Sequence, residues 1–165
     1  MIGSAIAHVA GEWGTGTILS SPLVRAAATS GIHSSILGWP METRDTLKEL
    51  SAGKLSGRRR DEVARGPLGI RRTWVERPPG GESYKDGEER LEPLEKEIRK
   101  TVQDRPLLIV GHGGINRSLL KRLLGLSPEE AMSVMVPHGI AYLLEGERVD
   151  RLGEDGIRMP GLLVT

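Results

Sequence analysis

The feature that most constrains the fold is a short apolar run followed at once by a glycine-rich turn. Residues 107–110 are Leu-Leu-Ile-Val, and Gly111-His112-Gly113-Gly114 leads directly into a helical pattern over 115–124. An unbroken apolar strand is typical of a sheet that is buried on both faces, and such sheets are usually parallel. A strand that turns straight into a helix favours alternating strands and helices. We therefore expect an α/β domain built on a mostly parallel sheet.

The rest of the chain fits this alternation. Small and apolar residues at helical spacing predict helices at 2–13 and 23–37. Ser83 and Asp86 resemble a capping box, which begins a helix that we expect to reach about residue 103. Shorter elements are expected as strands at 17–20, 39–44 and 140–144, a further hairpin strand at 147–152 and a short helix opened by Pro128. The pattern predicts one three-layer domain over residues 1–165.

One segment, residues 47–82, interrupts the alternation. It is rich in Gly, Pro and Arg, and it includes the basic runs 58–60 and 71–72. We expect it to cross the surface as a lid with a short helix near 59–64, because long ordered connections in compact domains often serve a site. The basic runs themselves are expected to be solvated.

Composition excludes several classes of function. The 165 residues carry a net charge of +1, which does not favour binding to nucleic acid or to a membrane surface. There is no cysteine, so disulfides and thiolate metal sites are excluded. No apolar run approaches the roughly 20 residues that span a bilayer, and the first ten residues do not resemble a signal peptide. We expect a cytoplasmic protein without a metal or cofactor.

Two strand-to-helix turns carry the candidate site. The first contains Ser20, Ser21 and Arg25, and the second contains His112. The carboxyl ends of strands in an open α/β sheet are where ligands bind, and helix N-termini there favour anions. Arg25 offers a forked donor and His112 a proton near neutral pH. With Gly113 and Gly114, which allow close backbone approach, these residues predict a phosphate site. Taken singly, each feature also has a purely structural explanation: the glycine turn as a tight strand–helix corner, and Arg25 as a solvated surface charge.

Together, the blocks resemble the histidine phosphatase superfamily, the phosphoglycerate-mutase-like proteins. The family pattern Ser-Ser-Pro-x-x-Arg-Ala-x-x-Thr is matched by residues 20–29. Leu-x-Glu-x-x-x-Gly is matched by residues 47–53, although Leu55 and Ser56 replace the usual Trp-Glu that follows. The remaining blocks are Pro-Gly-Gly-Glu-Ser at 79–83, Gly-His-Gly-Gly-x-x-Arg at 111–117, and Val136-Pro137-His138-Gly139 in place of the family's Pro-Asn-Gly turn.

The resemblance implies phosphoryl transfer through a phosphohistidine, with a small phosphorylated molecule as substrate. By position, Arg25 matches an arginine that cradles the phosphoryl group, His112 the second histidine and Glu49 the proton donor. The family's nucleophile lies in an Arg-His-Gly motif at the end of its first strand. This chain begins at the following helix and contains no Arg-His-Gly. We expect a phosphatase rather than a mutase, and little or no activity from the chain as it stands.

Three explanations of the absent motif stay open. The natural protein is longer and active, or the chain is a degenerate member that binds phosphorylated ligands, or two chains complete each other's sheets. The alternative to an enzyme is therefore a phosphate-binding or regulatory module that works as a homodimer. Without a central strand, we expect strand edges with unpaired backbone groups.

Overall fold

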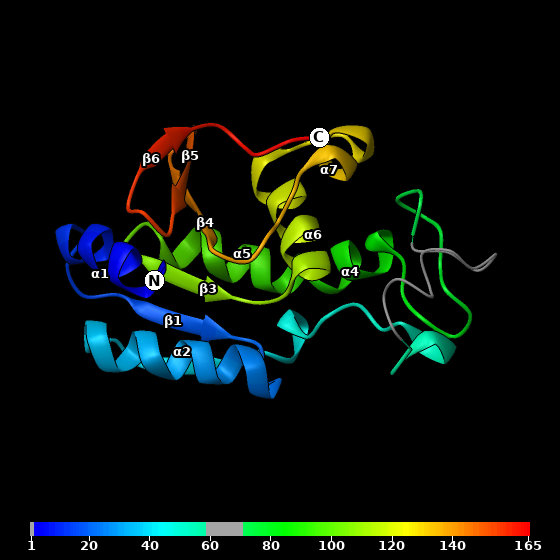
Figure 1. Ribbon diagram of the computed structural model, residues 1–165, viewed down its shortest axis with the longest axis horizontal. Coiled ribbons are helices and arrows are strands. Elements are labelled where there is room, and N and C mark those ends of the chain that lie inside the picture. The colour runs from blue at the N-terminus through cyan, green and yellow to red at the C-terminus, as the bar shows by residue number, and fades with distance from the viewer. Residues whose placement is uncertain (1, 59–70) are drawn as a thin grey trace.

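The computed structural model describes residues 2–58 and 71–165, and its elements follow the predicted alternation (Figure 1). The expected short helix near 59–64 lies outside the described residues. In chain order the elements are α1 (Ile2–Glu12), β1 (Thr17–Ser20), α2 (Val24–Leu37), β2 (Met41–Thr43), the 3-10 turns η1 (Asp45–Leu47) and η2 (Gly53–Leu55), α4 (Tyr84–Arg90), α5 (Glu92–Thr101), β3 (Leu107–Val110), α6 (Gly113–Leu124), α7 (Pro128–Ser133), β4 (Ile140–Glu145), β5 (Arg148–Gly153) and β6 (Arg158–Pro160).

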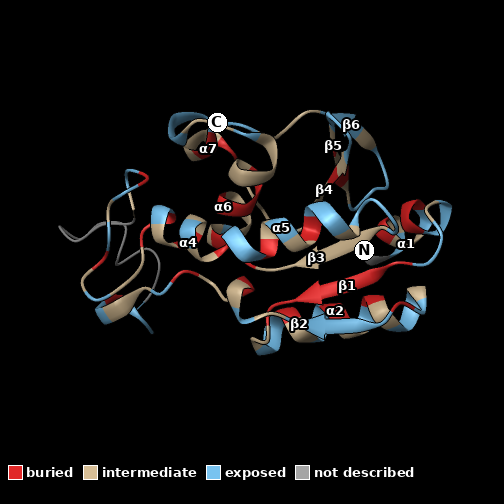
Figure 2. Ribbon diagram, turned by 180° about the vertical axis from the view of Figure 1, so that it is seen from behind, coloured by how far each residue is buried: buried red, intermediate tan, exposed pale blue. Residues whose placement is uncertain are grey.

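A parallel sheet of order β2-β1-β3 forms the middle layer, as the apolar run predicted. Side chains alternate between its faces. On one face, Ile18 packs with Trp39 and the α1 residue Ala10. On the other, Leu19 joins the largest buried cluster, which includes residues of α5 and α6. Figure 2 shows β1 buried along its length between these layers. The three-layer α/β architecture is confirmed.

The last three strands form a separate antiparallel sheet of order β4-β5-β6. The predicted hairpin is present as β4 and β5, while β6 was not predicted because Arg-Met-Pro carries no strand pattern. Helix α1 packs on this second sheet through Ile6 and Val9, which meet Leu143 and Leu152. Within the described residues, β3 pairs only with β1, and β4 pairs only with β5. Each of these two strands therefore has one edge without a strand beside it.

The helix expected from Ser83 to about residue 103 is divided at Leu91. Its capping box is confirmed: Ser83 Oγ accepts from the Asp86 N–H at 3.1 Å, and Asp86 Oδ2 accepts from the Ser83 N–H at 2.8 Å. Pro93 sits in the first turn of α5 and has no N–H to continue the α4 ladder. Leu91 is fully buried at this junction, and Leu94 and Ile98 bury one face of α5.

Helix α6 starts at Gly113, two residues before the predicted start, and its inner face anchors the core beside the site. Ile115 is 0% exposed and belongs to the cluster that contains Leu19 and Leu50. The buried face thus connects the first turn of α6 to the sheet and to the start of the 47–82 excursion.

Replacing Ile115 by alanine should lower the free energy of unfolding by about 2–5 kcal/mol, the usual cost of a cavity in a packed core. Ile32 on α2 is 61% exposed, so Ile32→Ala is the matched control and should change stability by less than about 0.5 kcal/mol. Urea unfolding followed by circular dichroism measures both. Equal losses in the two variants would contradict the packing described.

Candidate functional site

The register of the parallel sheet brings the two motif turns together. Ser20, the last residue of β1, is paired with Val110, the last residue of β3. The Ser21 N–H continues the ladder by donating to the Val110 carbonyl at 2.9 Å. Helices α2 and α6 start just beyond these strand ends. The first turns of both helices therefore begin at one edge of the sheet.

His112 lies at the centre of this edge. It is the N-cap residue of α6, has an extended backbone and is only 7% exposed. Its Nε2 lies 2.8 Å from the Ser21 hydroxyl oxygen. Burial lowers the pKa of His112, and the nearby Arg25 charge lowers it further, whereas Glu49 acts in the opposite direction. The ring is therefore neutral near pH 7, where it can both donate and accept.

Glu49 binds the N-terminus of α6 with its carboxylate. Oε1 accepts from the Ile115 N–H at 3.1 Å and from the Leu50 N–H at 2.9 Å, while Oε2 accepts from the Gly114 N–H at 3.2 Å. A Cβ at Gly114 would lie only 2.7 Å from Oε1, so this close approach needs glycine. The amide that we assigned to phosphate at Gly114 is thus engaged by Glu49. To act as an acid, Glu49 must gain a proton and release one of these contacts.

Arg25 stands in the first turn of α2 with an exposed side chain. It has no hydrogen bond or ion pair from its side chain within residues 2–58 and 71–165. Its charge nevertheless acts on His112, as the lowered pKa of that histidine shows. The structure thus brings Arg25, Glu49 and His112 to the same end of the sheet, with the Arg25 guanidinium available to a ligand.

Arg71 is a neighbour that the sequence analysis did not assign to the site. Its guanidinium donates to the carbonyls of Ser51, at 2.7 Å, and of Glu82. Burial lowers the pKa of Arg71, and the charge of Glu49 partly offsets that effect. A half-buried cation therefore lies near Glu49. No spacing distinguishes an arginine in an irregular segment, so only the tertiary structure reveals this position.

Two other predicted features have structural partners. Arg117 donates to the Val134 carbonyl at 2.9 Å and to the Tyr84 hydroxyl at 2.6 Å, so it ties α6 to α4 and to the end of α7. Gly113 keeps open space around its Cα, with only the Val136 carbonyl within 4 Å of a Cβ placed there. Gly113 is therefore the less crowded of the two glycines for an approaching ligand.

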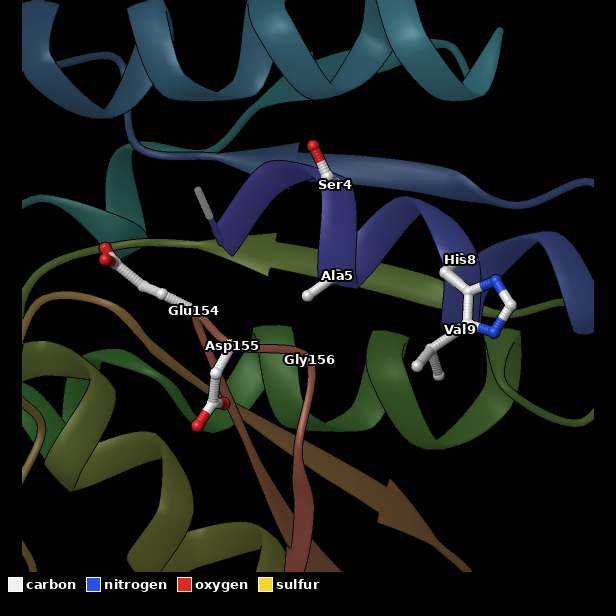
Figure 3. A pocket seen from close by; sticks show the side chains of 7 residues that line it. All are labelled: Ser4, Ala5, His8, Val9, Glu154, Asp155 and Gly156. Carbon is white, nitrogen blue, oxygen red and sulfur yellow. The ribbon is translucent and has the colours of Figure 1, made fainter.

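A hollow of ≈ 300 Å³ lies elsewhere, between α1 and the turn after β5 (Figure 3). It is lined by Ser4, Ala5, His8, Val9, Glu154, Asp155 and Gly156. None of the predicted site residues lines it. The described residues contain no cluster of three or more His, Asp or Glu placed to hold a metal ion, and none of their helices has the length and apolarity to cross a membrane.

The sequence matches the model of the histidine phosphatase superfamily (branch 1) over residues 4–150. A 2,3-bisphosphoglycerate-dependent phosphoglycerate mutase from Cytophaga hutchinsonii is 33% identical over 151 residues, covering 86% of this chain and 71% of the mutase. A glucosyl-3-phosphoglycerate phosphatase from Mycolicibacterium vanbaalenii is 33% identical over 120 residues, covering 66% of this chain and 53% of the phosphatase. This chain belongs to the histidine phosphatase superfamily.

The solved structures agree on the fold. A mycobacterial glucosyl-3-phosphoglycerate phosphatase in complex with inorganic phosphate superposes with a TM-score of 0.71 at 24% identity, covering 92% of this chain and 76% of that one. An alpha-ribazole phosphatase from Shigella flexneri gives a TM-score of 0.69 at 18% identity, covering 99% of this chain and 80% of that one. The α/β fold of these phosphatases is therefore the fold of this chain.

Replacing Arg25 or His112 by alanine should weaken the binding of phosphate or vanadate. The loss expected for Arg25→Ala is about tenfold or more, because a hydrogen bond from a charged donor contributes about 1.5–3 kcal/mol. Arg105→Ala is the matched control, since Arg105 precedes the opposite end of β3. Isothermal titration calorimetry measures the affinities. Equal binding by the wild type, Arg25→Ala and His112→Ala would reject this site.

Sulfate binding should strengthen as the pH falls. Sulfate keeps its charge between pH 8 and pH 5.5, whereas His112 gains a proton only below its lowered pKa, and therefore below about pH 6.5. The added positive charge should raise affinity by up to about fivefold, the size of a partly exposed charge pair. His112→Gln should remove the dependence, and His8→Gln, on the exposed side of α1, should keep it. A pH profile unchanged in His112→Gln would contradict this assignment.

Proposed function

We propose that the chain is a phosphoglycerate-mutase-like phosphatase unit that binds a small phosphomonoester, with little or no turnover by itself. The proposal is based mainly on one observation: Arg25, Glu49 and His112 lie at the same end of the sheet, just beyond the paired ends of β1 and β3. A cation at this sheet edge offsets charge on a phosphoryl group, and a neutral imidazole offers it a hydrogen bond. The carboxyl group, once protonated, can supply a proton to the leaving oxygen.

Each residue has a distinct role in this proposal. Arg25 offers forked donors to the phosphoryl oxygens and offsets their charge. His112 adds a hydrogen bond from a ring that carries no charge near pH 7. Glu49, held at the α6 N-terminus, protonates the leaving oxygen once it has taken up a proton. Gly113 and its uncrowded backbone let the ester approach this end of the helix.

The low turnover follows from where the chain's histidines lie. The sequence has four, and His112 is the one in the site. His8 lies on α1 at the separate hollow, and His33 is buried in α2, where desolvation lowers its pKa. His138 is in the turn before β4. With His112 bonded to Ser21 and serving the phosphoryl oxygens, no second imidazole of these four is assigned as nucleophile.

The names of two relatives support a phosphoglycerate-like substrate. The Cytophaga mutase and the Mycolicibacterium phosphatase both carry phosphoglycerate in their names. The second cation, Arg71, adds positive charge beside Glu49 and suits an ester with a further anionic group. Phosphatase remains our choice over mutase because the resemblance implies that true mutases carry additional segments around the lid.

The second candidate is a phosphate-binding or regulatory module that works as a homodimer. It is favoured by one observation: the binding groups Arg25 and His112 occur in a chain without an assigned nucleophile. The two candidates agree on ligand binding and differ in turnover. Hydrolysis of a small phosphomonoester by the protein with any natural upstream residues included would favour the enzyme.

The chain of 165 residues should not form a stable phosphohistidine. Breaking a catalytic unit of this kind costs roughly 10⁶-fold in rate, so only slow attack by water on the bound ester should remain. The test is incubation with a labelled phosphomonoester, an alkaline quench and a search for label that is stable in alkali and labile in acid. Stoichiometric label that disappears in His112→Ala would overturn the prediction, because it would give His112 a nucleophilic role.

A further inference from the structure

The side chain of Ser21 forms a buried hydrogen bond with the His112 ring, and the motif resemblance assigns no role to this contact. Ser21 is 0% exposed, and its hydroxyl oxygen lies 2.8 Å from Nε2 of the nearly buried His112 ring. A serine without solvent contact is not placed to attack or bind a ligand itself. Its influence on the site therefore passes through the imidazole.

The direction of this hydrogen bond follows from the other partners of Ser21. The Leu23 N–H donates to Ser21 Oγ at 3.2 Å, so one lone pair of the hydroxyl is occupied. No other acceptor for the hydroxyl proton occurs in residues 2–58 and 71–165. If Nε2 carried a proton, the buried hydroxyl proton would be left unpaired, which is costly. Ser21 therefore donates, and Nε2 accepts.

The neighbouring serines prevent competition for this proton. Ser30 Oγ donates to Ser20 Oγ at 2.7 Å, and Ser20 Oγ donates to the Ser21 carbonyl at 2.9 Å. All three serines are 0% exposed. The hydroxyl protons of Ser20 and Ser30 are thus both engaged, and Ser20 Oγ already accepts a hydrogen bond. The Ser21 hydroxyl is therefore free to donate to the imidazole.

The opposite ring nitrogen, Nδ1, makes no hydrogen bond within the described residues. It is also not among the buried polar atoms without partners in that part of the chain. Within the described residues, Nδ1 is therefore left without a competing partner. A neutral ring that accepts at Nε2 carries its proton at Nδ1, because neutral imidazole has one donor and one acceptor.

We propose that Ser21 is a positioning residue that holds neutral His112 in the Nδ1–H form, so that Nδ1 donates to an oxygen of the bound phosphoryl group. The inference rests on the proposed function for the identity of the ligand. The tautomer itself is a property of the ligand-free protein. Arg25 then supplies positive charge to the phosphoryl group, and His112 donates one hydrogen bond to it from Nδ1.

Two-bond ¹H–¹⁵N correlation spectra of the ligand-free chain at pH 8 read the tautomer directly, and His112→Gln assigns the signal. We expect His112 as Nδ1–H in the wild type and in Ser118→Ala, a control at a fully buried serine whose hydroxyl donates to the Tyr84 carbonyl and takes no part in the Ser20–Ser21–Ser30 contacts. Ser21→Ala should shift the ring toward Nε2–H. An Nε2–H ring in the wild type would overturn the proposal even if Ser21→Ala failed to fold and even if no anion bound.

Vanadate titration supplies the second measurement. Ser21→Ala should weaken binding by about threefold to tenfold, the size of one hydrogen bond. In a His112→Ala background, Ser21→Ala should cause no further loss, because Ser21 acts through the ring. Additive losses would overturn the positioning role. Absence of vanadate binding in the wild type, together with an Nδ1–H ring, would count against the proposed function and leave the tautomer inference supported.

Discussion

The parallel pairing of β1 with β3 is the interaction on which the rest of the structure depends. Its register ends both strands at one level, with Ser20 opposite Val110. A one-residue slip would reverse the side-chain faces and move one turn relative to the other. With the observed register, α2 and α6 point their first turns at the same solvent edge. Residues 87 positions apart in the chain, Arg25 and His112, can then act on one ligand.

Glu49 adds a second constraint, because it couples the 47–82 excursion to α6. Its carboxylate neutralises part of the positive end of the helix and caps the Gly114 and Ile115 amides. The same helix end suits an anion, so in the proposed function Glu49 and the phosphoryl group would lie close to one positive region.

The sequence predicted elements better than it predicted contacts. The apolar strand at 107–110 and the Ser83–Asp86 cap depend on local patterns, and both appear as expected. The glycine turn is shorter than expected, because Gly113 and Gly114 already belong to α6. The division at Leu91 was missed, although Pro93 carried the signal. The roles of Ser21 and Arg71 depend on residues far along the chain, and no local pattern encodes them. The resemblance predicted Arg25, Glu49 and His112 as site residues, but the hydrogen bond from the Gly114 N–H to Glu49 joins residues far apart in the chain and has no local signal.

Within the described residues, β3 has one edge that pairs with no strand, and this edge lies beside the candidate site. Open edges favour the addition of a further strand, because their N–H and C=O groups seek partners. A strand paired along the free edge of β3 would bring one of its ends beside His112, at the level where β3 itself ends. A further segment of the protein or a second chain would each be able to provide such a strand. In each case Arg25 and His112 are held by β1, β3 and their helices. In the proposed function, ligand affinity therefore depends on these contacts, whereas attack on phosphorus would need a group that we do not assign among them.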